Sequence, residues 1–208
     1  MDAPLFRPLA LPAGASRRRL EVFSPKLARR LSLTSYDAWR CWLVLEANPA
    51  VSMFCERPAR INGPTSSTLD FWVAMRDQPA GEFWLVVDDQ HKSSSTSSAA
   101  DLPQHVYGLV LRPITTTLLA ELAIPLANWA QILPFLVSFW AHRQALLEQS
   151  IVVELASWTT LGAVLERFAE HDSAAVQASL FWLVASGRVL SPDLATAPLT
   201  RATRFRRR

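Results

Sequence analysis

Five consecutive apolar residues, Phe83-Trp84-Leu85-Val86-Val87, restrict the fold of this chain more than any other segment. A strand that carries apolar side chains on both faces belongs in the interior of a sheet that is covered on both sides. A strand with one face in water would alternate apolar and polar residues instead. The run therefore predicts a layered α/β domain in which this strand is central.

Local patterns on either side of this run predict the other elements of the domain. Tyr36–Ala47 places apolar residues at helical spacing after Ser35, a good N-cap residue. Pro58 favours an edge position for the strand that contains it, and Pro134 bends or delays the helix that contains it. The sequence predicts further strands over 51–61, 69–75 and 106–111, a loop over 93–100, and helices over 115–123 and 128–149.

The last 60 or so residues have a different pattern. Helices are predicted over 160–169 and 173–186, followed by Gly187 as a C-cap residue and a short strand over 188–191. This order is the outline of a winged helix, a module that commonly places its second helix in a DNA groove. The second helix here carries almost no basic residues, so contact with a protein is an equally open alternative.

Length and composition suit a core domain with a small second domain. The chain has 208 residues, half of them hydrophobic, which is enough to bury a sizeable core. We expect an extended basic arm over residues 1–20, an α/β core over 21–150, and a helical or winged-helix-like module with a basic tail over 151–208.

Basic residues gather at both ends of the chain. Of the 21 basic residues, all but Lys26 and Lys92 are arginine. Arginine clusters suit contacts with phosphate, so they predict binding of double-stranded DNA, although a bias of the coding sequence towards arginine is the alternative. The candidate DNA-binding residues are Arg17, Arg18, Arg19, Arg204, Arg206, Arg207 and Arg208.

Several classes of protein are not expected. The N-terminus lacks the pattern of a signal peptide, and the most apolar stretch, Ile132 to Trp140, is about half the length of a membrane span. Cys41 and Cys55 lack metal-type spacing, so we expect reduced, buried thiols in a cytoplasmic protein with no membrane partner. The sequence contains no phosphate-binding loop of the P-loop or dinucleotide-binding type.

Polar residues at the ends of two strands are the candidates for chemistry. Asp70 begins one strand, and Asp88, Gln90 and Lys92 follow the next. Carboxylate and carbonyl oxygens are the ligands that Mg²⁺ prefers, and the bound metal activates water while a lysine stabilises the attacked phosphate. The alternative is that Asp70 caps a turn and that residues 88–92 are a solvated loop.

Two acids of the first predicted helix, Asp37 and Glu46, are candidates for a third position in such a site. Asp37 lies in the first turn, and Glu46 lies near the end of the helix. Either is alternatively an ordinary surface residue.

Several short segments resemble TnsA, the endonuclease subunit of multi-subunit transposases. The helix end Leu43 to Val51 is similar to that family's LLE-x-D-P-x-V pattern, and Phe54 to Pro58 is similar to its F-x-E-Q-P strand. Leu69-Asp70-Phe71 stands where the family has Pro-Asp-Phe. Leu126-Ala127-Asn128-Trp129 and Leu183 to Val189 are similar to later parts of the family.

This resemblance implies a restriction-endonuclease-like core of the PD-(D/E)xK type, Mg²⁺ as cofactor, and cutting at the 5′ ends of transposon DNA. It also implies two partners, a transposase that cuts and joins the 3′ ends and an ATPase regulator. In an active enzyme the catalytic residues are Asp70, Gln90, Lys92 and Asp37, and the metal ligands are Asp70, Asp88 and Glu46.

The sequence departs from the family at important positions. Ala38 stands near the family's helix glutamate, unless Asp37 replaces it. The third strand has Val86-Val87-Asp88 where an acid or glutamine, any residue and lysine are expected, and Gln90-His91-Lys92 recovers the pattern only later. Three hypotheses follow: an active endonuclease, a degraded accessory that binds DNA ends and the transposase without cutting, and a general DNA-binding protein.

Overall fold

A computed structural model describes residues 6–11, 19–61, 67–89 and 102–208 of the chain. The chain divides into two compact units, one within residues 1–45 and 50–121 and the other comprising 46–49 and 122–208. The division falls between Glu121 and Leu122, earlier than the boundary at residue 150 that we expected. Helix α3 (Ala123–Ser138) belongs to the second unit because it packs against α6 (Ser173–Ala185).

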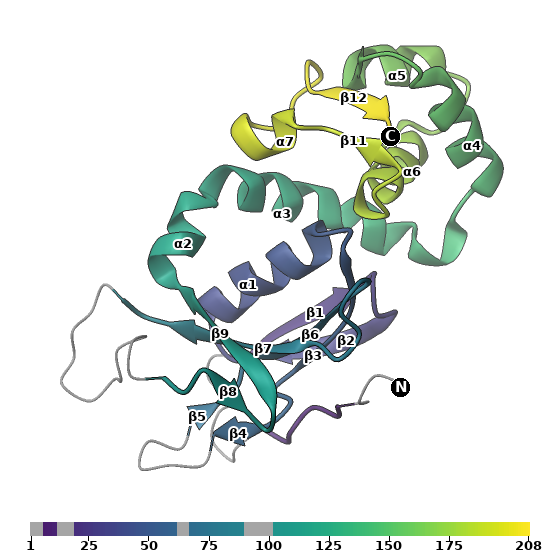
Figure 1. Cartoon of the computed structure of the whole chain (residues 1–208). Coiled ribbons are helices and arrows are strands. Elements are labelled where there is room, and N and C mark those ends of the chain that lie inside the picture. Colours follow the sequence, from purple (N-terminus) through teal and green to yellow (C-terminus); the bar gives the residue numbers. More distant parts are fainter. Residues whose placement is uncertain (1–5, 12–18, 62–66, 90–101) are drawn as a thin grey trace. The chain divides into compact units, whose positions relative to one another are not determined.

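The first unit contains a five-stranded mixed sheet with the strand order β3-β6-β7-β9-β8 (Figure 1). Strand β7 contains the apolar run and is the central strand, which confirms the prediction. Strands β3, β6 and β7 are antiparallel neighbours, whereas β7 and β9 are parallel. The bounds are β3 Val51–Glu56, β6 Phe71–Met75, β7 Glu82–Val87, β8 His105–Val106 and β9 Leu109–Thr115.

Helix α1 (Tyr36–Ala47) lies beside this sheet (Figure 1). The Ser35 hydroxyl accepts a hydrogen bond from the backbone N–H of Ala38 at 3.0 Å, so both the helix and its N-cap are confirmed. Phe6, from the segment 6–11, packs on Trp72 and Phe83 with ring centroids 5.2 and 5.4 Å away. That packing belongs to a buried cluster on one face of the sheet, which consists of Cys55, Leu69, Trp72, Ala74, Phe83, Leu85, Val87 and Leu111.

Two predicted strands differ from the observed ones. The strand expected over 51–61 is interrupted after β3, because Arg57 has a φ of +46° and Pro58 follows it. Strand β9 continues through Pro113, where we expected it to stop. Proline is tolerated there because β8 pairs only with the start of β9, which leaves Pro113 with a neighbouring strand on one side.

Several short elements complete the first unit. An antiparallel hairpin, which the sequence did not predict, joins two strands in the segment before α1. A second small hairpin precedes β6. The elements are β1 Leu20–Ser24, β2 Arg29–Leu33, β4 Arg60–Ile61, β5 Ser67–Thr68 and α2 Thr116–Glu121.

The second unit combines helices with a three-stranded sheet in the order β10-β12-β11. The helix expected over 128–149 is two helices, because α3 ends at Ser138 and α4 begins at Ala145. The basic tail that we expected forms strand β12, which pairs antiparallel with both other strands. The remaining elements are η3 Trp140–His142, α4 Ala145–Glu154, β10 Thr159–Thr160, α5 Leu161–Arg167, β11 Val189–Leu190, α7 Asp193–Thr196 and β12 Arg204–Arg207.

Helix α6 is apolar on all sides and packs against α3, α4 and α5. After Ser173 none of its residues is exposed. A helix that is apolar all round is buried on all sides. Helix α6 therefore has no fully exposed residue after Ser173, while Ala174, Gln177, Val184 and Ala185 are partly exposed, and contact of this helix with DNA or with a protein stays a prediction.

Within the described part of the chain, no helix has both the length and the apolar character needed to cross a bilayer.

Candidate nuclease-like site around Asp70

Asp70 lies in a bend immediately before β6 and is held by three hydrogen bonds. Its backbone N–H donates to the Trp84 carbonyl at 3.1 Å, and its carbonyl accepts from the N–H of Arg57 at 2.8 Å. Its carboxylate Oδ2 accepts from the backbone N–H of Val86 at 2.7 Å. The carboxylate is therefore fixed against the end of β7.

The carboxylate of Asp70 lies in a desolvated environment beside α1. Burial raises its pKa from 3.8 to about 6, the Val86 N–H opposes this rise, and the charge of Asp37 adds to it. Burial, and to a lesser extent the charge of Asp70, raises the pKa of the Cys41 thiol on α1. The charge of Asp37, another predicted site residue, thus acts on the Asp70 carboxyl group.

Strand β7 presents Val86 to the face opposite the buried cluster. Leu85 and Val87 belong to that cluster, and successive side chains of a strand alternate between faces. Val86 is half-buried, and the exposed Asp88 follows directly after the last residue of the strand. The β7 side chain next to the Asp70 hydrogen bond is therefore aliphatic, and a second carboxylate follows beyond the strand end.

Asp89 has a structural role that the sequence did not reveal. Its Oδ1 accepts hydrogen bonds from the Thr116 hydroxyl at 2.7 Å and from the Thr117 N–H at 3.1 Å. The bond from Thr116, followed by smaller contributions that include Thr117, lowers the pKa of Asp89. Asp89 thus satisfies free donors at the start of α2. The Thr116 hydroxyl also lies 3.4 Å from Oδ1 of Asp88.

The other predicted site residues are not gathered around Asp70. Asp37 forms an ion pair with Arg40 at 3.3 Å. Glu46 is buried nine residues farther along α1, about 13 Å along the helix axis, so it cannot share a metal ion with Asp37. Gln90 and Lys92 lie outside the described residues. Among the described side chains, no three of the His, Cys, Asp and Glu types are close enough together to hold a metal ion.

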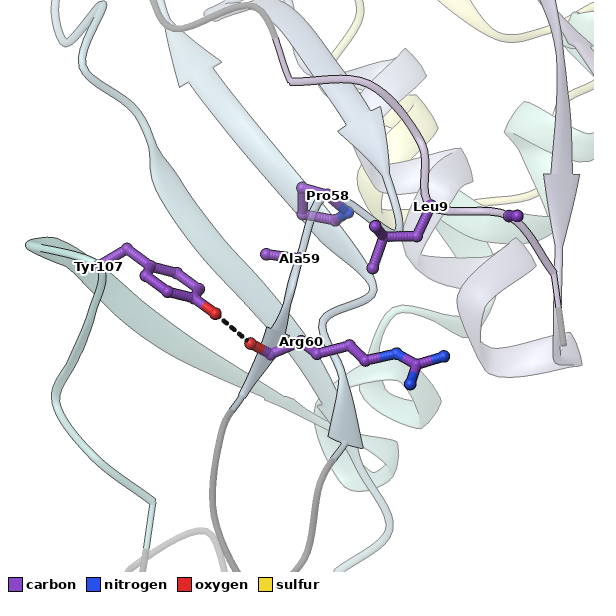
Figure 2. A pocket seen from close by; sticks show the side chains of 6 residues that line it. Leu9, Pro58, Ala59, Arg60 and Tyr107 are labelled. Carbon is purple, nitrogen blue, oxygen red and sulfur yellow. Dashed lines mark hydrogen bonds between the residues drawn. The ribbon is translucent and has the colours of Figure 1, made fainter.

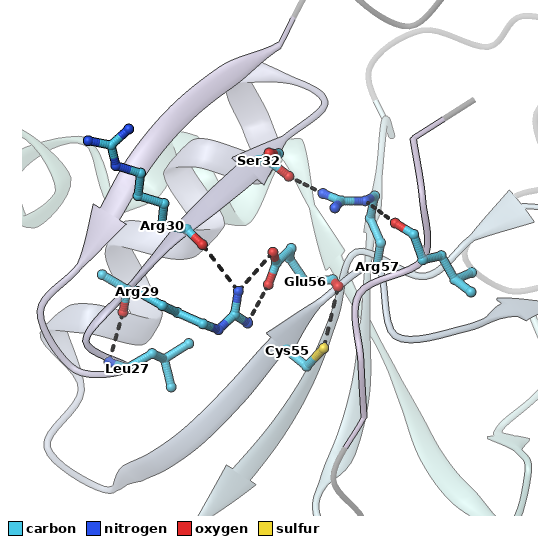
Figure 3. A network of polar contacts seen from close by, with 9 residues as sticks. Leu27, Arg29, Arg30, Ser32, Cys55, Glu56 and Arg57 are labelled. Carbon is cyan, nitrogen blue, oxygen red and sulfur yellow. Dashed lines mark hydrogen bonds and ion pairs between the residues drawn. The ribbon is translucent and has the colours of Figure 1, made fainter. Parts of the chain in front are cut away.

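Glu56, at the end of β3, is the buried acid of an ion pair whose basic partner is partly exposed (Figure 3). The Arg29 guanidinium donates to both oxygens of Glu56, at 3.0 and 2.6 Å. The next residue, Arg57, donates to the carbonyl oxygens of Leu9 and Ser32. These contacts join the β1-β2 hairpin and the N-terminal segment to the end of β3.

The predicted DNA-binding arginines fall into two groups. Arg204 is bound to both oxygens of Asp193 at 3.0 and 2.9 Å, and Arg19 pairs with Glu21. Arg206 stacks on Trp158 at 4.7 Å, and together with Arg207 and Arg208 it has no carboxylate partner among the described residues. The latter three are therefore available for phosphate. Arg17 and Arg18 lie outside the described residues.

Replacing Asp70 with asparagine is expected to stabilise the protein at neutral pH. The folded state raises the pKa of Asp70 above its unfolded value, so the free energy of unfolding falls as pH rises from about 4 to about 6. Asparagine keeps the acceptor for the Val86 N–H without the buried charge. We expect Asp70→Asn to add about 1–3 kcal/mol at pH 7.5 and nothing at pH 4.

Urea unfolding of both proteins across this pH range, in the presence of a chelator, measures the effect. Asp77→Asn, at an exposed turn position, is the matched control and should change stability by less than about 0.5 kcal/mol at every pH. A constant difference between Asp70→Asn and the natural protein from pH 4 to 8 would show that the carboxylate is not desolvated.

No protein-family model matches the sequence, and no curated protein matches it significantly.

Proposed function

We propose that this protein is a TnsA-like subunit of a multi-subunit transposase that binds transposon ends and its partner transposase without cutting DNA. The observation that carries the proposal is the end of β7, where Val86 binds the Asp70 carboxylate through its backbone N–H and Asp88 follows the strand. The order of the first unit, a helix, three antiparallel strands and a fourth strand parallel to the third, supports a restriction-endonuclease-like core.

The side chains of Val86 and Asp88 do not supply the groups that catalysis by such a core requires. The first position should supply an oxygen ligand, and the aliphatic side chain of Val86 has none. The second position should supply a cation to the attacked phosphate, and Asp88 places a negative charge there instead. The backbone N–H of Val86 binds the Asp70 carboxylate directly.

The second unit supports a DNA-holding role through its sheet. The order α4, β10, α5, α6, β11, α7 and β12, with β12 between the other two strands, fits a winged-helix-like module. Since α6 carries no basic side chain, we assign the DNA contact to the end of β12, at Arg206, Arg207 and Arg208. The ring of Trp158 under Arg206 fixes the direction of that guanidinium.

A second candidate function is an active Mg²⁺-dependent endonuclease. It is favoured by one observation, the effect of the Asp37 charge on the buried Asp70 carboxyl group, since a metal ion would neutralise the repulsion between two such carboxylates. In that case Asp70 and Asp37 hold the metal, and Gln90 and Lys92 complete the site.

Binding and nicking assays on the purified protein separate these functions. We expect salt-sensitive binding of duplexes that carry the element's ends, tighter than binding of unrelated duplexes, and no nicking with Mg²⁺ or Mn²⁺, with or without the partner transposase. Replacing Arg206, Arg207 and Arg208 by glutamine should reduce the slope of log affinity against log salt by about 2–3, whereas Arg204→Gln should not change it.

Each contrary result selects another function. Nicking that disappears in Asp70→Ala and Lys92→Ala establishes the endonuclease and ends the non-cutting proposal. Equal affinity for transposon ends and unrelated duplexes makes the protein a general DNA-binding protein. If the protein binds no DNA, all three candidate functions are excluded.

A further inference from the structure

An exposed pair of stacked aromatic rings lies at the start of α1. Tyr36 and Trp39 have ring centroids 5.1 Å apart and planes inclined by only 23°. Tyr36 remains 65% exposed, while Trp39 is half-buried and packs against one face of the Tyr36 ring. One face of an oriented aromatic ring is thus open to solvent, which is the arrangement by which proteins stack nucleobases.

A small cavity with a mainly apolar lining and several polar groups includes Thr34, two residues before Tyr36. It has a volume of about 280 Å³, and its lining includes Thr34, Thr68, Arg57, Arg60 and Asp70. Consecutive Cα atoms are 3.8 Å apart, so the Cα atoms of Thr34 and Tyr36 are separated by at most about 7.6 Å. The cavity and the aromatic pair are therefore neighbours on the first unit.

The two arginines of the cavity are not equivalent. Arg57 uses its guanidinium to donate to the carbonyls of Leu9 and Ser32. Arg60 is exposed, and its guanidinium has no hydrogen bond or ion pair with any described residue. The Tyr107 hydroxyl donates to the Arg60 carbonyl at 2.7 Å, and Figure 2 shows the guanidinium extending away from Tyr107 on the side of Leu9. Arg60 thus offers a planar donor beside the cavity that no described residue binds.

The charges around the cavity determine which side of it suits a bound anion. Asp70 lines the cavity and Asp37 lies near Asp70, so a phosphate there would meet like charge. Arg60 and the hydroxyl side chains of Thr34 and Thr68 line the cavity too, and these groups suit a phosphate. A phosphate would therefore bind next to Arg60.

We propose that this surface binds an unpaired nucleotide at the end of a DNA strand, with its base stacked on Tyr36 and its phosphate beside Arg60. The inference rests on the proposed DNA-binding function and names the part of the DNA that the first unit holds. A base inside a duplex is already stacked on both faces, so only an unpaired base can use the Tyr36 ring.

Binding of the full chain to two DNA probes tests the inference. One probe is a blunt duplex, and the other is the same duplex with a single-stranded 5′ overhang carrying 2-aminopurine. Tyr36→Ala should weaken overhang binding about tenfold and leave blunt-duplex binding unchanged. Tyr36→Phe keeps the ring and should bind like the natural protein. Leu118→Ala, another exposed apolar residue of the first unit, is the control and should have no effect.

Two further comparisons separate stacking from a general loss of binding. Removing the overhang bases to leave abasic sites should abolish the difference between Tyr36→Ala and the natural protein. Arg60→Gln should lower the salt slope for the overhang by about 1, and Arg76→Gln, at an exposed turn, should not.

The outcomes distinguish this inference from the function on which it rests. If the natural protein binds neither probe, the DNA-binding function and the inference both fail. If it binds DNA but Tyr36→Ala binds the overhang normally, or loses the blunt duplex equally, only the inference fails. Unfolding curves of each variant that superimpose on the natural one exclude misfolding as the cause.

Discussion

Asn128→Asp is expected to lower the free energy of unfolding of the second unit by about 3–5 kcal/mol. Asn128 is 1% exposed on α3, and its side-chain N–H₂ donates to the carbonyls of Leu194 and Ala197 at 2.9 and 2.8 Å. Its Oδ1 accepts from the N–H of Leu199 at 2.7 Å. Aspartate has nearly the same shape, but it sets a second oxygen against two carbonyl oxygens in a buried site.

Urea unfolding followed by far-ultraviolet circular dichroism measures this loss. Gln131→Glu makes the same amide-to-carboxylate change on the exposed side of the same helix and should cost less than about 0.5 kcal/mol. If Asn128→Asp unfolds at the same urea concentration as the natural protein, the segment 194–199 is held by something other than this amide.

Glu56→Gln is expected to destabilise the first unit by about 1.5–3 kcal/mol. The Glu56 side chain is 4% exposed and accepts both bonds of the Arg29 guanidinium. Glutamine keeps one acceptor but leaves the Arg29 charge without its partner. Since the Arg29 side chain is 37% exposed, water compensates part of that loss, and the expected cost is below that of a fully buried pair.

A double variant shows whether the unpaired charge of Arg29 causes the loss of stability expected for Glu56→Gln. Replacing both Arg29 and Glu56 with methionine removes the charges together and should recover most of the stability lost in Glu56→Gln. Glu21→Gln, in the exposed pair with Arg19, is the control and should give no measurable change. If the double variant is less stable than Glu56→Gln, the pair contributes net stability and the desolvation argument is wrong.

Asp70 was predictable from a sequence motif, whereas the residues that accompany it in the structure were not. Its place at the start of an apolar strand, together with the resemblance of Leu69-Asp70-Phe71 to Pro-Asp-Phe, made it the leading site residue, and the structure places it in a desolvated position. The partner that the next strand supplies depended on which residues at the end of β7 share its face. Strand register places Val86 opposite the buried cluster, and the strand ends at Val87, before Asp88.

For the C-terminal arginines, composition did not predict the local structure. Their composition indicated a basic tail suited to phosphate, yet Phe205 among them is fully buried and the segment 204–207 forms β12 between two other strands. Asp193 takes Arg204 as a partner across the turn. Neither contact leaves a local pattern, because each joins residues that are 11 or more positions apart.

The sequence by itself determined the elements whose causes are local. Helix α1 with its Ser35 cap, the central strand β7 and helix α6 follow from side-chain periodicity, capping residues and apolar runs within a few positions. Only the tertiary structure decided that Asp89 caps α2, that Asn128 holds the segment after α7, and that α6 has no fully exposed residue after Ser173. Those outcomes depend on which distant backbone groups need a partner once they are buried, and burial is a property of the packed chain.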